Sequence, residues 1–148
     1  ADRLDEAIKR SQRSKHEIAI LFIDLNKFKP INDELGHDAG DQALRFVADQ
    51  MKESVRDSDT VARVGGDEFV VLLENVAGAG VVETIANKIL VNISKPVEFS
   101  SGPRSMGAAM GIALHPQHGE TRDELMKNAD QAMYEAKETG ENCYRIWH

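Results

Sequence analysis

The sequence predicts a single α+β domain, and three patterns carry that prediction. An apolar run from Glu17 to Asp24 has the length and composition of a strand buried on both faces. Two runs rich in β-branched residues, between Val61 and Leu73, flank a Gly-Gly pair, which is typical of a β-hairpin. Helical periodicities alternate with these strands. Because the hairpin makes part of the sheet antiparallel, the class is α+β.

The remaining elements follow from periodicity and end signals. Asp38 is expected to cap a long helix that ends near Asp57. Thr121-Arg-Asp-Glu124 forms a capping box that opens the last helix. The expected helices span 1–15, 26–36 (short or irregular), 38–57, 81–93 and a segment from 121 onward, and the further strands span 95–100, 105–114 and 143–147.

Composition favours one acidic domain in a reducing compartment. The 148 residues, 41% of them hydrophobic, are enough to bury one sizeable core. A net charge of −7 argues against nucleic-acid binding, which needs clustered Lys and Arg. The single Cys143 excludes an internal disulfide, and no apolar run reaches membrane-spanning length. We expect a cytoplasmic domain without direct membrane contact, free or as the cytoplasmic part of a membrane-anchored protein. The start at Ala1, without an initiator Met, suggests an N-terminally truncated fragment of a longer protein.

The hairpin turn carries two adjacent acids. Asp67 and Glu68 directly follow Gly65-Gly66, where glycine would supply a positive φ and let a ligand approach the backbone. Because successive strand side chains point to opposite faces, the two acids should have different roles. A solvated turn with incidental acids is the alternative interpretation.

The central strand supplies another acid. Asp24 lies at its C-terminal end, where open sheets place ligand sites, although Asp is also a common turn residue there. If Asp24 and Asp67 meet, their carboxylates are costly to hold together unless a cation lies between them. Mg²⁺ prefers such oxygen ligands together with substrate phosphates. The pattern therefore points to phosphoryl or nucleotidyl transfer.

Two other polar patterns receive simpler interpretations. His115 and His118 lack acid or Cys partners at ligand spacing, so we expect both to lie in a solvated loop. Asp41 lies in the first turn of the expected helix 38–57, where an acid complements the helix dipole.

Three ordered blocks carry a family resemblance. Arg63-Val-Gly-Gly-Asp-Glu-Phe69 contains a GGDEF signature. Asp24-Leu-Asn-Lys-Phe-Lys-Pro-Ile-Asn-Asp33 with Gly36-His-Asp-Ala-Gly-Asp41 resembles that family's other main block, and Asn128–Lys137 resembles a third. The chain resembles a GGDEF domain of the diguanylate cyclase family over nearly its whole length. We interpret residues 1–148 as one such domain.

The resemblance implies a nucleotidyl-cyclase-like fold, of the palm or ferredoxin-like kind, whose mostly antiparallel central sheet is flanked by helices. It implies condensation of two GTP into cyclic di-GMP and two pyrophosphates. The family's catalysis needs a homodimer, since each domain supplies one 3′-hydroxyl and one α-phosphate. Mg²⁺ or Mn²⁺ would be held by Asp24, the Leu25 carbonyl and Asp67. Asp24, Asp67 and Glu68 match the catalytic acids, with Glu68 as a further metal ligand or an aid to the general base.

The same resemblance assigns the substrate contacts. Asn32 and Asp41 match residues that read the guanine edge. A carboxylate can accept from guanine N1 and N2, and an amide can both donate and accept. The backbone amides of Lys27 and Phe28 and the ammonium of Lys137 match phosphate contacts.

A second nucleotide site is implied upstream of the hairpin. Arg56-Asp-Ser-Asp59 matches the family's RxxD product-inhibition motif. Arg56 would fork onto a guanine or phosphate of cyclic di-GMP, and Asp59 would accept from a guanine. An ordinary exposed helix end is the alternative.

The chain departs from the family pattern at three places. Glu141 stands where many members have Arg, and an acid there would repel a triphosphate. Position 26 is Asn where Asp is frequent, and the usual Leu-Thr-Gly-Leu-x-Asn-Arg lead-in is absent. A catalytically weak or inactive domain that binds GTP or cyclic di-GMP and regulates a neighbour therefore remains the alternative. Either interpretation implies sensory or phosphodiesterase domains in the full-length chain.

Overall fold

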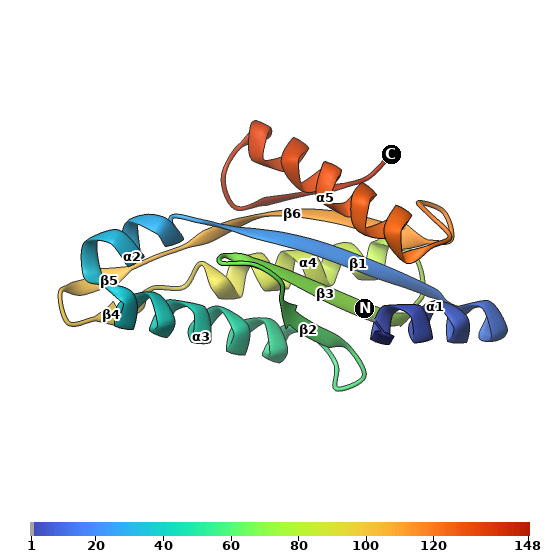
Figure 1. Cartoon of the computed structure of the whole chain (residues 1–148), viewed down its shortest axis with the longest axis horizontal. Coiled ribbons are helices and arrows are strands. Elements are labelled where there is room, and N and C mark those ends of the chain that lie inside the picture. Colours follow the sequence, from blue (N-terminus) through green and yellow to red (C-terminus); the bar gives the residue numbers. More distant parts are fainter. Residues whose placement is uncertain (1) are drawn as a thin grey trace.

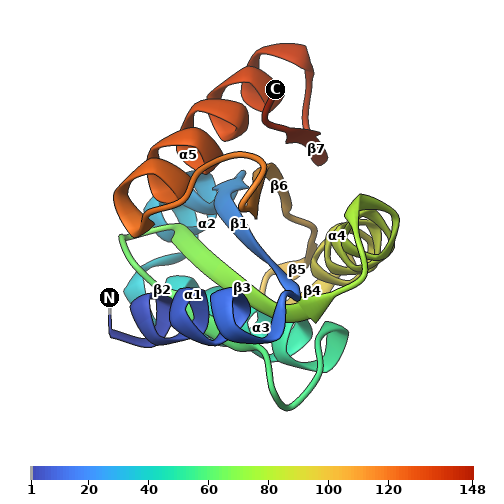
Figure 2. The ribbon, with the colours of Figure 1, turned by 90° about the vertical axis from the view of Figure 1, so that its right-hand side faces the viewer.

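The structure, a computed structural model, describes residues 2–148. A central sheet lies between two layers of helices (Figure 1; Figure 2). The helices are α1 (Asp2–Ser14), α2 (Phe28–Leu35), α3 (His37–Ser54), α4 (Ala79–Ile93) and α5 (Arg122–Thr139), and the strands are β1 (Glu17–Asn26), β2 (Thr60–Arg63), β3 (Glu68–Val76), β4 (Val97–Phe99), β5 (Gly102–Arg104), β6 (Gly107–His115) and β7 (Cys143–Ile146).

The main sheet confirms the expected class. Its five strands lie in the order β2-β3-β1-β6-β7, and every neighbouring pair is antiparallel except β6 and β7. The strands β4 and β5 form a separate two-stranded sheet. The fold is therefore α+β with a mostly antiparallel sheet flanked by helices, as the family resemblance implied.

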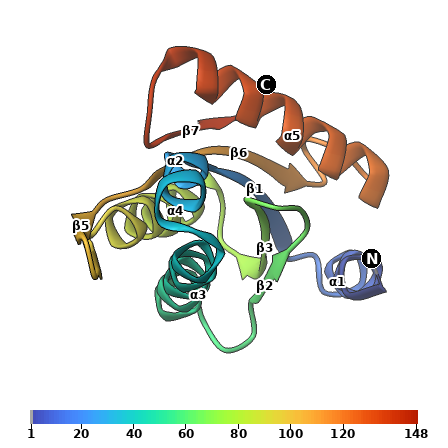
Figure 3. The same cartoon turned by 60° about the vertical axis from the view of Figure 1, so that its left-hand side comes forward.

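The central strand β1 is buried on both faces. Leu21 and Ile23 pack into a core formed with α2, α3 and α4, whereas Ile20 and Phe22 pack into a second core formed with α1 and α5. Figure 3 shows the two helical layers on opposite sides of the sheet. Burial of each such side chain contributes about 1.5–3 kcal/mol, which fixes the register of β1 and hence the position of its C-terminal end.

Helix α5 approaches the sheet unusually closely. Its buried stripe contains Ala129, Ala132 and Ala136, as expected from the sequence. A Cβ added to Gly111 of β6 would lie 1.9 Å from the Ala129 carbonyl oxygen and 2.3 Å from the Met133 nitrogen. Only glycine at position 111 permits this approach, and α5 is thereby held against β6 and β1.

Several element boundaries differ from the sequence predictions. Gly36, not Asp38, precedes α3, and its φ of 93° is a value that glycine adopts readily; Asp38 lies in the first turn. Helix α3 ends at Ser54, before the expected Asp57. Strand β5 was not predicted, because Gly102-Pro-Arg104 lacks the β-branched residues typical of strands. The capping box of Thr121 is confirmed, since its side chain accepts a hydrogen bond from Glu124 N.

The prediction of a solvated loop at the two histidines is wrong for His115. It ends β6 with 3% of its surface exposed, because the apolar strand continues one residue further than expected. His118 lies in the following turn and is half-buried, and its Nδ1 accepts a hydrogen bond from Leu114 N at 2.9 Å. Within residues 2–148, no helix combines the length and apolarity needed to cross a membrane.

Substitution of Gly111 tests the close approach of α5. We expect Gly111→Ala to lower the free energy of unfolding by about 3 kcal/mol, because the new methyl meets backbone atoms that cannot rotate away. Gly80→Ala in the first turn of α4 is the control, since nothing lies within 4 Å of its added Cβ. Chemical denaturation measures both. Equal stability of the two variants would contradict the packing described.

Candidate active site

The β2–β3 hairpin turn is shaped around the carboxylate of Glu68. The Glu68 carbonyl accepts hydrogen bonds from Val64 N at 2.9 Å and Gly65 N at 3.4 Å. Neither Gly65 nor Gly66 has a positive φ, so that sequence prediction is wrong. A Cβ on Gly65 would instead lie 2.7 Å from Glu68 Oε1. Glycine at position 65 therefore leaves room for an acidic side chain.

The central strand brings Asp24 to this turn. Asp24 lies opposite Glu68 in the β1–β3 register, and Leu25 N donates to the Asp67 carbonyl at 3.0 Å. The Asp24 side chain is only 10% exposed. The expectation that Asp24 and Asp67 adjoin is thus met by backbone pairing, and the turn-residue alternative does not explain a buried carboxylate.

The negative charge of each carboxylate makes ionisation of the neighbouring carboxyl groups less favourable. The pKa of Asp67 is raised, first by burial and then by the negative charge of Asp24. Burial and the charges of Asp24, Asp67 and Asp130 likewise raise the pKa of Glu68. Such a cluster is stabilised by cations.

Helix α5 supplies one cation and a further acid. Lys137 Nζ lies 2.5 Å from Asp24 Oδ2, and this hydrogen bond raises the pKa of Lys137. Asp130 lies two turns earlier on α5, and burial followed by the charge of Asp24 raises its pKa. Asp130 was not predicted from the sequence to belong to the site. Its seven-residue spacing from Lys137, which places both on one helix face, was the available signal.

The donor set suits a metal that shares its coordination with a substrate. Among the residues that the structure describes, no three His, Cys, Asp or Glu side chains are grouped as metal ligands. Asp24 and Asp67 with the Leu25 carbonyl are two carboxylates and one neutral oxygen. Mg²⁺ is usually bound by one or two carboxylates with phosphates and waters, so this set fits Mg²⁺ completed by a nucleotide.

The start of α2 offers backbone donors next to this cluster. Lys27 precedes the helix with a left-handed φ of 67°, and no side chain caps the helix start. The first N–H groups of a helix have no intrahelical partner and favour anions. The expected phosphate contacts at Lys27 and Phe28 therefore lie where phosphate oxygens can be bound.

Asn32 packs against α3 at Gly40, the residue before Asp41. A Cβ on Gly40, which precedes Asp41, would lie 2.3 Å from Asn32 Oδ1, so the amide packs directly on the α3 backbone. Asn32 is half-buried and Asp41 is exposed. Within residues 2–148, neither side chain makes a hydrogen bond, which leaves both available to a ligand.

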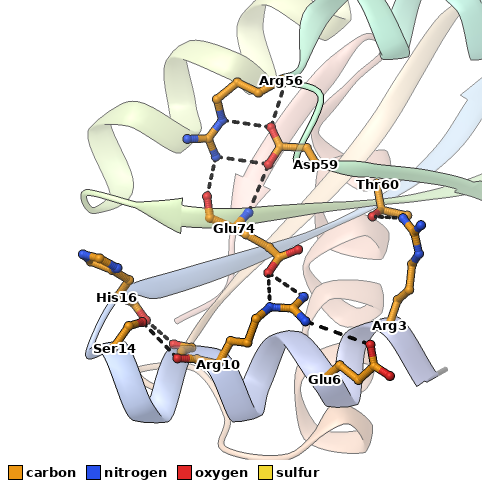
Figure 4. Close-up of polar contacts among 10 residues, drawn as sticks. Arg3, Glu6, Arg10, Ser14, His16, Arg56, Asp59, Thr60 and Glu74 are labelled. Atoms are coloured by element: carbon orange, nitrogen blue, oxygen red, sulfur yellow. Dashed lines mark hydrogen bonds and ion pairs between the residues drawn. The ribbon is translucent and has the colours of Figure 1, made fainter.

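Arg56 and Asp59 form a closed network at the opposite end of β3 from Glu68 (Figure 4). Arg56 Nε and Nη2 donate to the two oxygens of Asp59 at 3.0 and 3.1 Å, and Arg56 N donates at 2.9 Å. Asp59 also accepts from Glu74 N at 3.1 Å, and Arg56 donates to the Glu74 carbonyl. The Asp59 side chain is fully buried while that of Arg56 is 47% exposed. Asp59 therefore orients Arg56, and both residues line a hollow of about 280 Å³.

Comparison with known proteins decides the family. A family model described as "Diguanylate cyclase, GGDEF domain" matches residues 1–143. The chain belongs to the GGDEF domain family. The crystal structure of the GGDEF domain of TpbB from Pseudomonas aeruginosa superposes with a TM-score of 0.95 at 40% identity, covering 99% of this chain and 92% of that one.

Other relatives combine this GGDEF domain with additional sequence. The chain is 47% identical over 143 residues to a bifunctional diguanylate cyclase/cyclic di-GMP phosphodiesterase, MucR of Pseudomonas aeruginosa, covering 97% of this chain and 21% of MucR. It spans 33% of the diguanylate cyclase TpbB, at 41% identity over 97% of its own length. The GGDEF domain of DgcB from Caulobacter crescentus, solved in complex with c-di-GMP, has a TM-score of 0.86 at 29% identity over 99% of this chain and 85% of that one.

The raised pKa of Asp67 predicts a gain in stability when its charge is removed. Its folded-state pKa lies above the ordinary value of 3.8, so the folded domain binds more protons than the unfolded chain in the window above that value. Stability contributed by Asp67 therefore falls as pH rises through this window. We expect Asp67→Asn to raise the melting temperature at pH 7 without divalent cations, and the gain to vanish near pH 4. A variant that melts at or below the wild-type temperature at pH 7 would contradict this electrostatic account.

Proposed function

We propose that this GGDEF domain is a diguanylate cyclase, which condenses two GTP into cyclic di-GMP and two pyrophosphates. The observation that carries the proposal is the convergence of Asp24, Asp67 and Glu68 with Lys137 beside the uncapped start of α2. Diguanylate cyclases among its relatives support the same reaction.

The substrate contacts follow from the available donors and acceptors. Asp41 accepts from guanine N1 and N2 while Asn32 donates to and accepts from the same base. The amides of Lys27 and Phe28 donate to phosphate oxygens, and Lys137 supplies a positive charge. Lys137 forms an ion pair with Asp24, and it exchanges this partner for a phosphate when a cation neutralises Asp24.

The reaction joins two copies of the domain. The 3′-oxygen of one GTP bonds to the α-phosphorus of the other, and the bond from that phosphorus to pyrophosphate breaks. Mg²⁺ or Mn²⁺ held by Asp24, the Leu25 carbonyl and Asp67 would activate the hydroxyl and stabilise the leaving group. Glu68, whose pKa is raised, assists removal of the hydroxyl proton. The second bond forms in the same way with the roles exchanged, so a monomer is inactive.

One observation favours a second candidate function. The acid Glu141 lies at the phosphate end of the site, where its carboxylate is 3.4 Å from Lys27 Nζ. A domain with weakened GTP binding would hold GTP or cyclic di-GMP and regulate an attached domain. Phosphodiesterase and sensory domains are the partners that we propose for a longer chain, in keeping with bifunctional relatives such as MucR. A cytoplasmic location provides the GTP.

Removal of Asp67 tests the cyclase proposal. Wild-type protein incubated with GTP and Mg²⁺ should yield cyclic di-GMP on nucleotide chromatography, and Asp67→Ala should lower the yield about 100-fold or more. The reason is that Asp67 binds the cation that stabilises charge in the transition state. Asp49→Ala, at an exposed position of α3, is the matched control and should leave the yield unchanged. Nucleotide binding without turnover, in a preparation shown to dimerise, would support the regulatory alternative instead.

We also propose that Arg56 and Asp59 form an inhibitory site for cyclic di-GMP. The exposed guanidinium of Arg56 donates a pair of hydrogen bonds to a phosphate or guanine of the product. Each oxygen of Asp59 already accepts two hydrogen bonds, so Asp59 accepts from a guanine only by giving up one of these.

Substitution of Arg56 tests the inhibitory site. Arg56→Ala should weaken cyclic di-GMP binding about tenfold, because a charge-assisted pair of hydrogen bonds is lost. The fold should survive, since Arg56 N and Glu74 N still donate to Asp59. Calorimetric titration with cyclic di-GMP measures the effect, with Arg45→Ala on α3 as the control. Undiminished affinity in Arg56→Ala would refute the site.

A further inference from the structure

The turn that carries Glu141 is hydrogen-bonded to the end of β1, just before α2. Asn142 N donates to Asn26 Oδ1 at 3.1 Å, and the Asn142 side chain accepts from Ala108 N at 3.2 Å. Asn142 itself adopts a left-handed φ of 52°. These contacts join the α5–β7 connection to the end of β1 and to the start of β6. The backbone next to Glu141 is therefore fixed close to Lys27, which lets the two side chains meet.

The ion pair between Lys27 and Glu141 reduces the repulsion that Glu141 exerts on a phosphate. Lys27 Nζ lies 3.4 Å from Glu141 Oε2, and the two side chains are 60% and 67% exposed. From the sequence, Glu141 alone would repel a triphosphate. With Lys27 beside it, the local charge is balanced. An exposed pair of this kind is weak, so either partner can be exchanged for a stronger one.

A nucleotide triphosphate is such a stronger partner. In the proposed function the backbone amides of Lys27 and Phe28 bind phosphate oxygens, which brings the terminal phosphates near the Lys27 side chain. The terminal phosphate group of a nucleotide carries more negative charge than a carboxylate, and its oxygens make strong charge-assisted hydrogen bonds. The ammonium of Lys137 is similarly paired, with Asp24. Both ammonium groups near the phosphates are thus neutralised by an acid before the nucleotide arrives.

We propose that the Lys27 ammonium leaves Glu141 to bind the terminal phosphates of GTP, and that Glu141 sets the affinity by competing for it. This inference rests on the proposed function. It assigns a role to the Lys27 side chain, distinct from that of its backbone amide, and makes Glu141 a residue that tunes GTP binding.

A double-substitution cycle with a non-hydrolysable GTP analogue and Mg²⁺ tests the exchange. Lys27→Met should weaken binding about fivefold, since it removes the cation but keeps the backbone amide. Glu141→Gln should tighten binding about fivefold when Lys27 is present and less than about twofold in the Lys27→Met background. The dependence on Lys27 distinguishes competition for the ammonium from direct repulsion of the triphosphate by Glu141. If Glu141 acted only by repulsion, Glu141→Gln would tighten binding equally in both backgrounds.

Controls place the effect at the terminal phosphates. GMP lacks them, so its affinity should not respond to Lys27→Met. Lys127→Met and Glu138→Gln change net charge by the same amounts at exposed positions of α5 and should leave binding of the GTP analogue unchanged.

Three results would overturn the exchange alone, provided that the wild type binds the analogue. They are no response to either substitution, equal tightening by Glu141→Gln in both backgrounds, and equal weakening of GMP and GTP analogue by Lys27→Met. No binding of the analogue by folded wild-type protein would overturn the proposed function together with this inference.

Discussion

The mutual repulsion of carboxylates at the end of β1 is the constraint on which this structure depends. Asp24 is nearly buried, and Asp67, Glu68 and Asp130 all have a pKa raised by burial and by the charge of Asp24. A fold selected for stability alone gains nothing from carboxylates that make one another's ionisation less favourable. Local destabilisation of this kind is typical of sites that bind cations or perform proton transfer.

The rest of the fold keeps these acids together. Two cores on opposite faces fix the register of β1, and β1–β3 pairing sets Asp24 opposite Glu68. Gly111 lets α5 approach the sheet closely enough for Lys137 to reach Asp24. Lys137 offsets part of the repulsion through its ion pair with Asp24. The packing of the two cores and of α5 at Gly111 therefore determines which charged groups meet in the site.

Much of this arrangement was predictable from the sequence. The apolar run of β1 and the hairpin predicted the class, and the signature residues predicted where Asp24 and Asp67 would meet. Asp130 was missed because its effect arises only when α5 lies across β1. The pairing of Lys27 with Glu141 was missed for a related reason, since it joins residues 114 positions apart through the separate anchoring of Asn142.

The role predicted from the sequence for the two glycines of the hairpin turn was wrong. At positions 65 and 66 the sequence suggested a need for positive φ, whereas neither glycine has one, and the missing side chain at position 65 leaves room for Glu68 Oε1. The sequence alone does not reveal whether a glycine is present for its access to positive φ or for its lack of a side chain. The buried His115 shows the same limit for strand ends, because a polar residue that ends a strand can be buried by the strands and helices around it.

The central claim is that the acids are assembled to bind a divalent cation together with a nucleotide. The most direct measurement is the melting temperature of the domain as Mg²⁺ is titrated, with and without a non-hydrolysable GTP analogue. The account predicts a large rise only when both are present, and its loss in Asp24→Asn. An equal rise with the analogue and a chelator, or an undiminished rise in Asp24→Asn, would contradict it.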